Sequence, residues 1–100
     1  MTSAKPFEGV LGNNCELRLI QFLLPLEGID FNIMELAEEV KMSRVTAIKV
    51  VKKFTEWGLL LKRRYENATY YSINMQSPIV ASIQQVNNAL IEVMLGNQRE

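Results

Sequence analysis

The stretch MELAEEVKMSRVTAIKVVKKFTEWGLL, residues 34–60, decides the fold of this 100-residue chain. Apolar residues recur in its first part at the spacing of an α-helix, which predicts a helix over residues 33–40. Asn32 and Glu35 stand three residues apart where that helix begins, which is the arrangement of a capping box. The first part of the stretch therefore predicts a short helix of about two turns.

A second, longer helix is predicted after a tight connection. Ser43 is a suitable N-cap for it, and Gly58 can end it as the residue after the C-cap. Between these positions, residues 43–57 place their apolar side chains on one face. These side chains are Ala47, Val50, Val51, Phe54 and Trp57. Two helices joined by such a short turn form a helix-turn-helix.

Two strand-like runs follow the longer helix. Residues 59–65 and 69–74 are rich in Leu, Tyr and Thr, and residues 66–68 between them suit a short loop. We therefore expect a β-hairpin directly after the helix-turn-helix. The predicted fold is mainly α with a small β-hairpin, which is a winged helix-turn-helix.

The residues before this core add a helix and a short extended segment. Residues 15–24 are predicted to be helical, with Asn13 or Asn14 as the N-cap and Pro25 as the stop. Apolar side chains cover two faces of this helix, so we expect it to be packed on both sides. Residues 29–31 are long enough for one short edge strand only.

A last helix is predicted over residues 77–95. Ser77 caps it, Pro78 suits its first position, and Gly96 with Asn97 is expected to end it. Its apolar residues alternate at steps of four and three, which is the spacing of a coiled-coil seam and favours a dimerisation helix. Packing on the first helix of the same chain would produce the same spacing, and remains the alternative.

Length and composition favour one domain that associates with a second copy. The chain is 48% apolar and 22% charged, which is ordinary for a globular protein. We expect a single domain over residues 1–100, with a polar lead-in (1–12), a core (14–75) and the last helix (77–95). A domain of this size buries only about 60–70% of its unfolded surface, so a homodimer would add burial. The predicted dimer interface is Leu19, Phe22, Leu23, Ile79, Ile83, Val86, Leu90, Val93 and Met94.

Several classes of function are excluded by the residues that the chain lacks. There is no histidine and only one cysteine, Cys15, so His-based catalysis, His metal sites and a CxxC pair are ruled out. We expect no enzyme, no metal and no cofactor. Cys15 is expected to be a small buried hydrophobe, with a redox role as the alternative. A membrane span requires about 18 consecutive apolar residues, and every apolar run in this sequence is much shorter. We expect a cytoplasmic, nucleoid-associated protein.

The net charge of zero conceals one basic region. Eight of the eleven Lys and Arg residues lie within residues 41–64, against a single acidic residue, Glu56. This stretch therefore carries +7, while three basic against ten acidic residues give −7 elsewhere. A basic patch on an otherwise acidic chain is typical of a protein that binds a polyanion.

The side of the longer helix opposite its apolar face stays free and basic, and an α-helix fits the major groove of B-DNA. We expect the basic hairpin strand to contact the adjacent backbone or the minor groove. The predicted DNA contacts are Ser43, Arg44, Val45, Thr46, Ile48, Lys49, Lys52 and Lys53 on the helix, and Lys62, Arg63, Arg64 and Asn67 on the hairpin. Of these, Val45 and Ile48 are suited to thymine methyl groups.

Residues 17–74 resemble the core of MarR-type and ArsR-type winged-helix regulators. The resemblance is carried by an LAE segment, Ser-x-x-Thr at the start of the longer helix, a basic stretch, a large apolar residue and Gly-Leu-Leu before the wing. The matching residues are Leu36, Ala37, Glu38, Ser43, Thr46, Lys49, Lys52, Lys53, Phe54, Gly58, Leu59 and Leu60. The resemblance implies a dimeric transcriptional regulator that binds double-stranded DNA in a sequence-specific manner. It also implies DNA contacts by Ser43, Arg44, Thr46, Lys49, Arg63 and Arg64.

The chain departs from that pattern at three positions. Val45 and Ile48 stand where small polar residues are usual, and Ala47 stands where a larger aliphatic residue is usual. Apolar side chains at the first two positions also suit a protein partner. The alternatives are therefore a winged helix that serves as a protein-interaction module in a transcription or sorting complex, and an architectural or plasmid-partition DNA binder. A small-molecule effector is left open.

Overall fold

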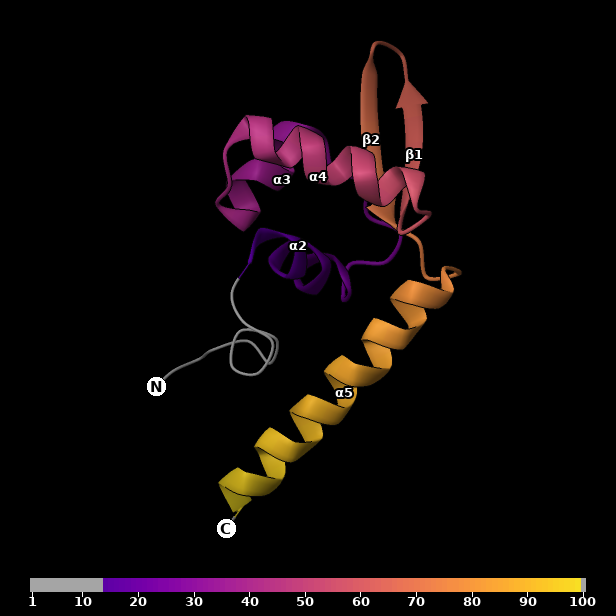
Figure 1. The fold of residues 1–100 in the computed structure, drawn as a ribbon. Coiled ribbons are helices and arrows are strands. Elements are labelled where there is room, and N and C mark those ends of the chain that lie inside the picture. The colour runs from indigo at the N-terminus through magenta and orange to yellow at the C-terminus, as the bar shows by residue number, and fades with distance from the viewer. Residues whose placement is uncertain (1–13, 100) are drawn as a thin grey trace.

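The computed structural model describes residues 14–99, and the predicted lead-in (1–12) and Asn13 lie outside the described residues. The elements are α2 (Cys15–Leu23), α3 (Ile33–Val40), α4 (Arg44–Glu56), β1 (Leu60–Tyr65), β2 (Ala68–Ile73) and α5 (Pro78–Arg99) (Figure 1). Helices α2, α3 and α4 pack together, with the hairpin beside them and α5 running away from them. This is the predicted mainly α fold with a small hairpin.

The three helices of the core begin at polar caps. The Asn14 side chain accepts a hydrogen bond from the backbone N–H of Leu17 at 2.9 Å, which starts α2. Asn32 and Glu35 form the predicted capping box of α3. The Ser43 hydroxyl accepts from the backbone N–H of residue 46 at 3.1 Å. Such caps satisfy amide groups that have no partner inside the helix, and this fixes where each helix begins.

Two residues with positive φ end the helices of the helix-turn-helix. Lys41 has φ of 60° and closes α3 in the left-handed conformation, so that the chain turns at once into α4. Gly58 has φ of +82° after α4, a conformation that favours glycine. The tight turn at Lys41 leaves only a short connection between α3 and α4, which pack against each other.

One apolar core joins all of these elements. Its fully buried side chains come from α2, α3, α4, β2 and the first turn of α5: Leu19, Ile20, Leu23, Leu36, Val51, Ile73 and Val80. Leu19 and Leu23 were expected in a dimer interface, and that prediction is corrected because both are 0% exposed within one protomer. Phe22 is half-buried and packs on Phe31, with ring centroids 5.3 Å apart. Cys15 is half-buried against the same core.

The hairpin is antiparallel and its loop is shorter than predicted. Tyr65 pairs with Ala68, so Ala68 belongs to β2 and the loop is Glu66 and Asn67 alone. The expected edge strand at residues 29–31 is reduced to one bridge, in which Phe31 and Tyr71 exchange two N–H to carbonyl bonds of 2.8 Å. This bridge ties β2 to the segment before α3.

Helix α5 is longer than predicted and leaves the core after its first half. It continues through Gly96 to Arg99, because Gly96 keeps a helical conformation and has no positive φ. Val80 anchors it in the core, and the Gln21 side chain donates to the Asn87 Oδ1 atom at 3.2 Å. Toward its C-terminus α5 projects away from α2, α3 and α4, as Figure 1 shows.

Candidate nucleic-acid interface

Helix α4 has a buried face and an exposed face. Ala47, Val50 and Val51 are buried against the core, together with Phe54. The opposite side is exposed and carries the residues Arg44, Val45, Ile48, Lys49, Lys52 and Glu56. Burial of the apolar side thus leaves outward the part of α4 that sequence analysis predicted to contact DNA.

The cations on this exposed side have no acidic partner among residues 14–99. Lys49 and Lys52 make no ion pair in that part of the chain, and neither does Arg44. Their charge is therefore directed to the solvent. Exposed cations without counter-charges on a helix are suited to bind phosphate groups, which dominate the affinity of proteins for DNA.

Lys53 is placed differently from its neighbour Lys52. Its ammonium group forms an ion pair with Glu16 of α2 and lies 5.4 Å from the centre of the Trp57 ring. Lys53 was predicted to contact DNA, and within the protomer its charge is partly neutralised by Glu16. Adjacent residues on a helix point about 100° apart, which accounts for the different surroundings of the two lysines.

Two apolar side chains lie among the cations. Val45 is 63% exposed and Ile48 is 49% exposed. Removing such side chains from water is favourable, so a ligand whose apolar group covered them would gain free energy of binding. A thymine methyl group in the major groove is one such partner, and an apolar protein surface is another.

The hydroxyl groups at the start of α4 are engaged with each other. The Ser43 hydroxyl donates to Thr46 Oγ1 at 2.9 Å while it accepts from the Thr46 N–H. This pair builds the N-terminus of α4, where the backbone N–H groups give a partial positive charge. Ser43 therefore has a structural role in addition to any contact with DNA.

The hairpin divides its basic residues between two faces. Lys62 pairs across the sheet with Tyr71, and Arg64 with Thr69, so these residues share one face. Arg63 lies on the other face, opposite Tyr70, and forms an ion pair with Asp30. Of the predicted wing contacts, Lys62 and Arg64 are therefore unpaired within residues 14–99, whereas Arg63 is partly neutralised. Asn67 is exposed in the loop at the hairpin tip.

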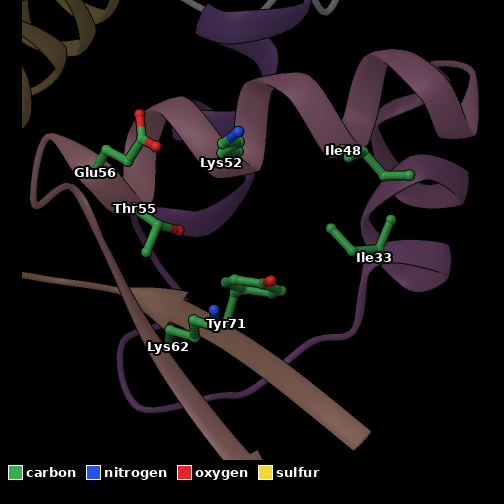
Figure 2. Close-up of a pocket in the computed structure, with 7 residues that line it drawn as sticks. All are labelled: Ile33, Ile48, Lys52, Thr55, Glu56, Lys62 and Tyr71. Carbon is green, nitrogen blue, oxygen red and sulfur yellow. The ribbon is translucent and has the colours of Figure 1, made fainter.

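A groove of about 380 Å³ separates the exposed side of α4 from the hairpin. Lys52 lines it from α4, Lys62 from β1 and Tyr71 from β2. Figure 2 shows the Tyr71 ring between α4 and the strands, with Ile33 and Ile48 at one end of the groove. The groove brings together cations that were predicted separately on the helix and on the hairpin.

Sequence analysis missed Tyr71 as a residue of this face. A three-residue loop would have shifted the pairing of the strands by one residue and placed Tyr71 opposite Arg63. The two-residue loop places it opposite Lys62 instead. Because a shift of one residue exchanges the two faces of a strand, the loop length was the signal that would have found Tyr71.

Residues 14–99 hold no group of three or more Cys, Asp or Glu side chains that is arranged to bind a metal ion. Over the same range, none of the helices is both long and apolar enough to cross a membrane.

Comparison with solved structures places this geometry among known folds. The chain is 24% identical to the AntR antimony-specific transcriptional repressor, with a TM-score of 0.65 over 88% of this chain and 76% of that one. The chain has a winged-helix fold. A second winged-helix match is the adhesin competence repressor of Streptococcus pyogenes, with 15% identity and a TM-score of 0.64 over 83% of this chain and 64% of that one.

A third solved structure matches this chain over most of the length of both proteins. Rv0081 of M. tuberculosis is 21% identical, with a TM-score of 0.63 over 94% of this chain and 90% of that one. By sequence, no family model and no curated protein matches the chain. These comparisons confirm the predicted winged-helix fold, in which the hairpin is the wing and α4 is the helix after the turn.

Proposed function

We propose that this winged helix is a transcriptional regulator that binds double-stranded DNA as a homodimer. In this proposal α4 lies in the major groove and the wing lies on the adjacent backbone or in the minor groove. One observation carries it: α4 and the wing together expose five cations that have no acidic partner within residues 14–99. These are Arg44, Lys49, Lys52, Lys62 and Arg64. The names of two proteins with this fold, AntR and the adhesin competence repressor, describe repressors, which supports the proposal.

The roles of the residues follow from their places on α4. Arg44 lies in the first turn, where the N-terminal residues of a helix in the major groove reach base edges. Lys49 and Lys52 lie further along, where phosphate contacts fix the orientation of the helix without reading sequence. Val45 and Ile48 contact thymine methyl groups, which favours sites rich in A·T pairs.

The exposure of Val45 and Ile48 also favours a second candidate, in which α4 binds a protein partner. The two candidates differ in their dependence on salt. Binding to DNA releases counterions, so the logarithm of the association constant falls steeply and linearly with the logarithm of the salt concentration. An apolar protein contact has no such steep dependence.

The test measures fluorescence anisotropy of a labelled duplex at several KCl concentrations, with unlabelled random duplex as competitor. We expect salt-dependent binding, weakened in a Lys49→Glu, Arg64→Glu variant that keeps the thermal midpoint of the wild type. Retained affinity in that variant would contradict the assigned face. Equal competition by every sequence would instead support the architectural alternative, and absence of duplex binding would support the protein-interaction module.

The proposed dimer interface is a stripe of apolar residues along α5. Ile79, Val86 and Val93 are spaced seven residues apart and are 46%, 45% and 59% exposed. Leu90 lies between them and is half-buried. Residues seven apart on a helix share one side, so a second copy of α5 would cover all of them at once.

An apolar groove continues this stripe toward the core. Its volume is about 420 Å³, and its lining includes Ile79 and Ile83 of α5 and Trp57 at the end of α4. Trp57 is 61% exposed although it is the largest apolar side chain in the protein. We propose that the far half of the partner subunit's α5 covers this groove, which would bury apolar area that one protomer leaves in water.

Analytical ultracentrifugation of Val93→Asp tests the interface. Val93 has no role in the core of the protomer, so the variant should fold and sediment as a monomer where the wild type is a dimer. Asn88→Asp is the matched control, because it adds the same charge on another side of α5. Asn88 lies about 160° around the helix from Val86, which belongs to the same stripe as Val93. A wild-type chain that is monomeric at high micromolar concentration would contradict the dimer.

A further inference from the structure

The groove between α4 and the wing has polar groups on opposite walls that lack a partner. Lys52 contributes an ammonium group from α4, and Lys62 contributes one from β1. Tyr71 of β2 contributes a phenol hydroxyl. Within residues 14–99, none of these three groups forms a hydrogen bond or an ion pair with the protein. Each can donate a hydrogen bond, and two carry positive charge.

Two other polar side chains line the groove, Thr55 and Glu56. The Thr55 hydroxyl donates to the carbonyl of Val51 at 2.7 Å. The Glu56 carboxylate also lines the groove, so the two lysines leave the groove a net charge of +1. The arrangement is therefore suited to an anion with several acceptor oxygens.

Tyr71 is held firmly in place. Its backbone N–H and carbonyl both bond to Phe31 at 2.8 Å, and its half-buried ring packs on the core. A hydroxyl on a fixed ring loses little conformational entropy when it binds a ligand, unlike the end of a lysine side chain. Tyr71 thus supplies the fixed point of the groove, while Lys52 and Lys62 supply charge.

We infer that this groove is a seat for one phosphate of the DNA backbone. The phosphate lies between the two ammonium groups and accepts a hydrogen bond from the Tyr71 hydroxyl. This inference rests on the proposed function, and it makes Tyr71 a positioning residue. A phosphate held between α4 and the wing fixes how deeply α4 enters the major groove and where the wing meets the backbone.

The test compares Tyr71→Phe with Tyr70→Phe in the full-length chain. Both variants remove one hydroxyl from β2, but Tyr70 lies on the opposite face of the wing, beside Arg63. We expect Tyr71→Phe to weaken duplex binding about tenfold per protomer, the usual effect of losing a hydrogen bond to a charged group. Tyr70→Phe should bind as the wild type does.

The dependence on salt separates a phosphate contact from a general loss of structure. Tyr71→Phe removes no charge, so its slope of log K against log [KCl] should equal that of the wild type. Lys62→Met should reduce the magnitude of the slope by about 0.9 per protomer. A third measurement uses duplexes in which one phosphate at a time is replaced by an uncharged methylphosphonate. At one position per half-site, the replacement should remove the contact of Tyr71, so that Tyr71→Phe and the wild type bind with equal affinity.

The outcomes distinguish the inference from the function on which it rests. If the wild type shows no salt-dependent duplex binding, the proposed function fails. If the wild type binds DNA but Tyr71→Phe equals Tyr70→Phe, the function stands and the phosphate seat is wrong. If Tyr71→Phe does not fold, Lys62→Met is used in its place. The inference then requires one methylphosphonate position at which Lys62→Met and the wild type bind equally. The absence of such a position overturns the inference.

Discussion

Two adjacent lysines on α4 make the sharpest prediction about the DNA-binding face. Lys52 is exposed and lines the groove beside the wing, whereas Lys53 is paired with Glu16 on the other side of the helix. Substitution of each by Met removes the same charge and keeps the length of the apolar side chain. Only the Lys52→Met variant should lose a contact with DNA.

The magnitude follows from counterion release. One lost phosphate contact lowers the slope of log K against log [salt] by about 0.9, and a dimer loses two contacts, or about 1.8. The free energy of binding contributed by one contact is about 0.9 RT multiplied by the natural logarithm of the inverse salt concentration. With RT of about 0.59 kcal/mol and about 0.15 M salt, it is about 1 kcal/mol per contact. Lys52→Met should therefore bind duplex DNA about 5-fold more weakly per protomer, or about 30-fold as a dimer.

The slopes of both variants are measured by fluorescence anisotropy titrations of a labelled duplex. The KCl concentration is varied between roughly 50 and 300 mM, a range in which such slopes are linear. Lys53→Met should retain the slope of the wild type and should lower stability by up to about 1 kcal/mol, because it loses a partly exposed ion pair. Equal slopes for Lys52→Met and wild type, or a reduced slope for Lys53→Met alone, would refute the assignment of the exposed face.

Three further predictions concern the cap, the dimer and base recognition. Ser43→Ala should lower the free energy of unfolding by about 1 kcal/mol in urea titrations, because it removes the cap of α4, and an unchanged value would contradict that role. Trp57, the single tryptophan, should show a shift of its emission to longer wavelength when the dimer is diluted, and emission independent of concentration would count against its burial by the partner. Arg44→Ala should relax the preference at one base pair by about 1–3 kcal/mol in competition assays, whereas a uniform loss over all sequences would assign Arg44 to phosphate.

Local chemistry explains why most of the fold could be predicted from the sequence. Asn32, Glu35 and Ser43 are caps whose effect is confined to one turn of helix, and the structure places them as expected. Helical spacing was enough to predict the buried side of α4, except that Trp57, which the spacing placed on that side, is 61% exposed. The basic side of α4 was predictable for the same reason, since it is what remains after the core face is buried.

The errors arose where tertiary contacts or a single turn decide the outcome. The pattern of α2 shows two apolar faces, but only the folded core shows that Leu19 and Leu23 are both enclosed within one protomer. The ion pair of Lys53 with Glu16 is a feature that the sequence analysis left out, since Glu16 lies in a distant part of the chain and no local pattern reveals the contact. A loop shorter by one residue exchanged the faces of the wing and brought Tyr71 to the groove.

Selection of bound sequences from a pool of random duplexes tests the central claim most directly, because it reports DNA binding, base recognition and symmetry together. A dimer that places two copies of α4 in successive major grooves should enrich an inverted repeat, with half-sites about 10 bp apart or a multiple of that spacing. The enriched half-site should be rich in A·T pairs, which present thymine methyl groups to Val45 and Ile48. A pool that shows no enrichment after repeated rounds would contradict sequence-specific DNA binding by this winged helix.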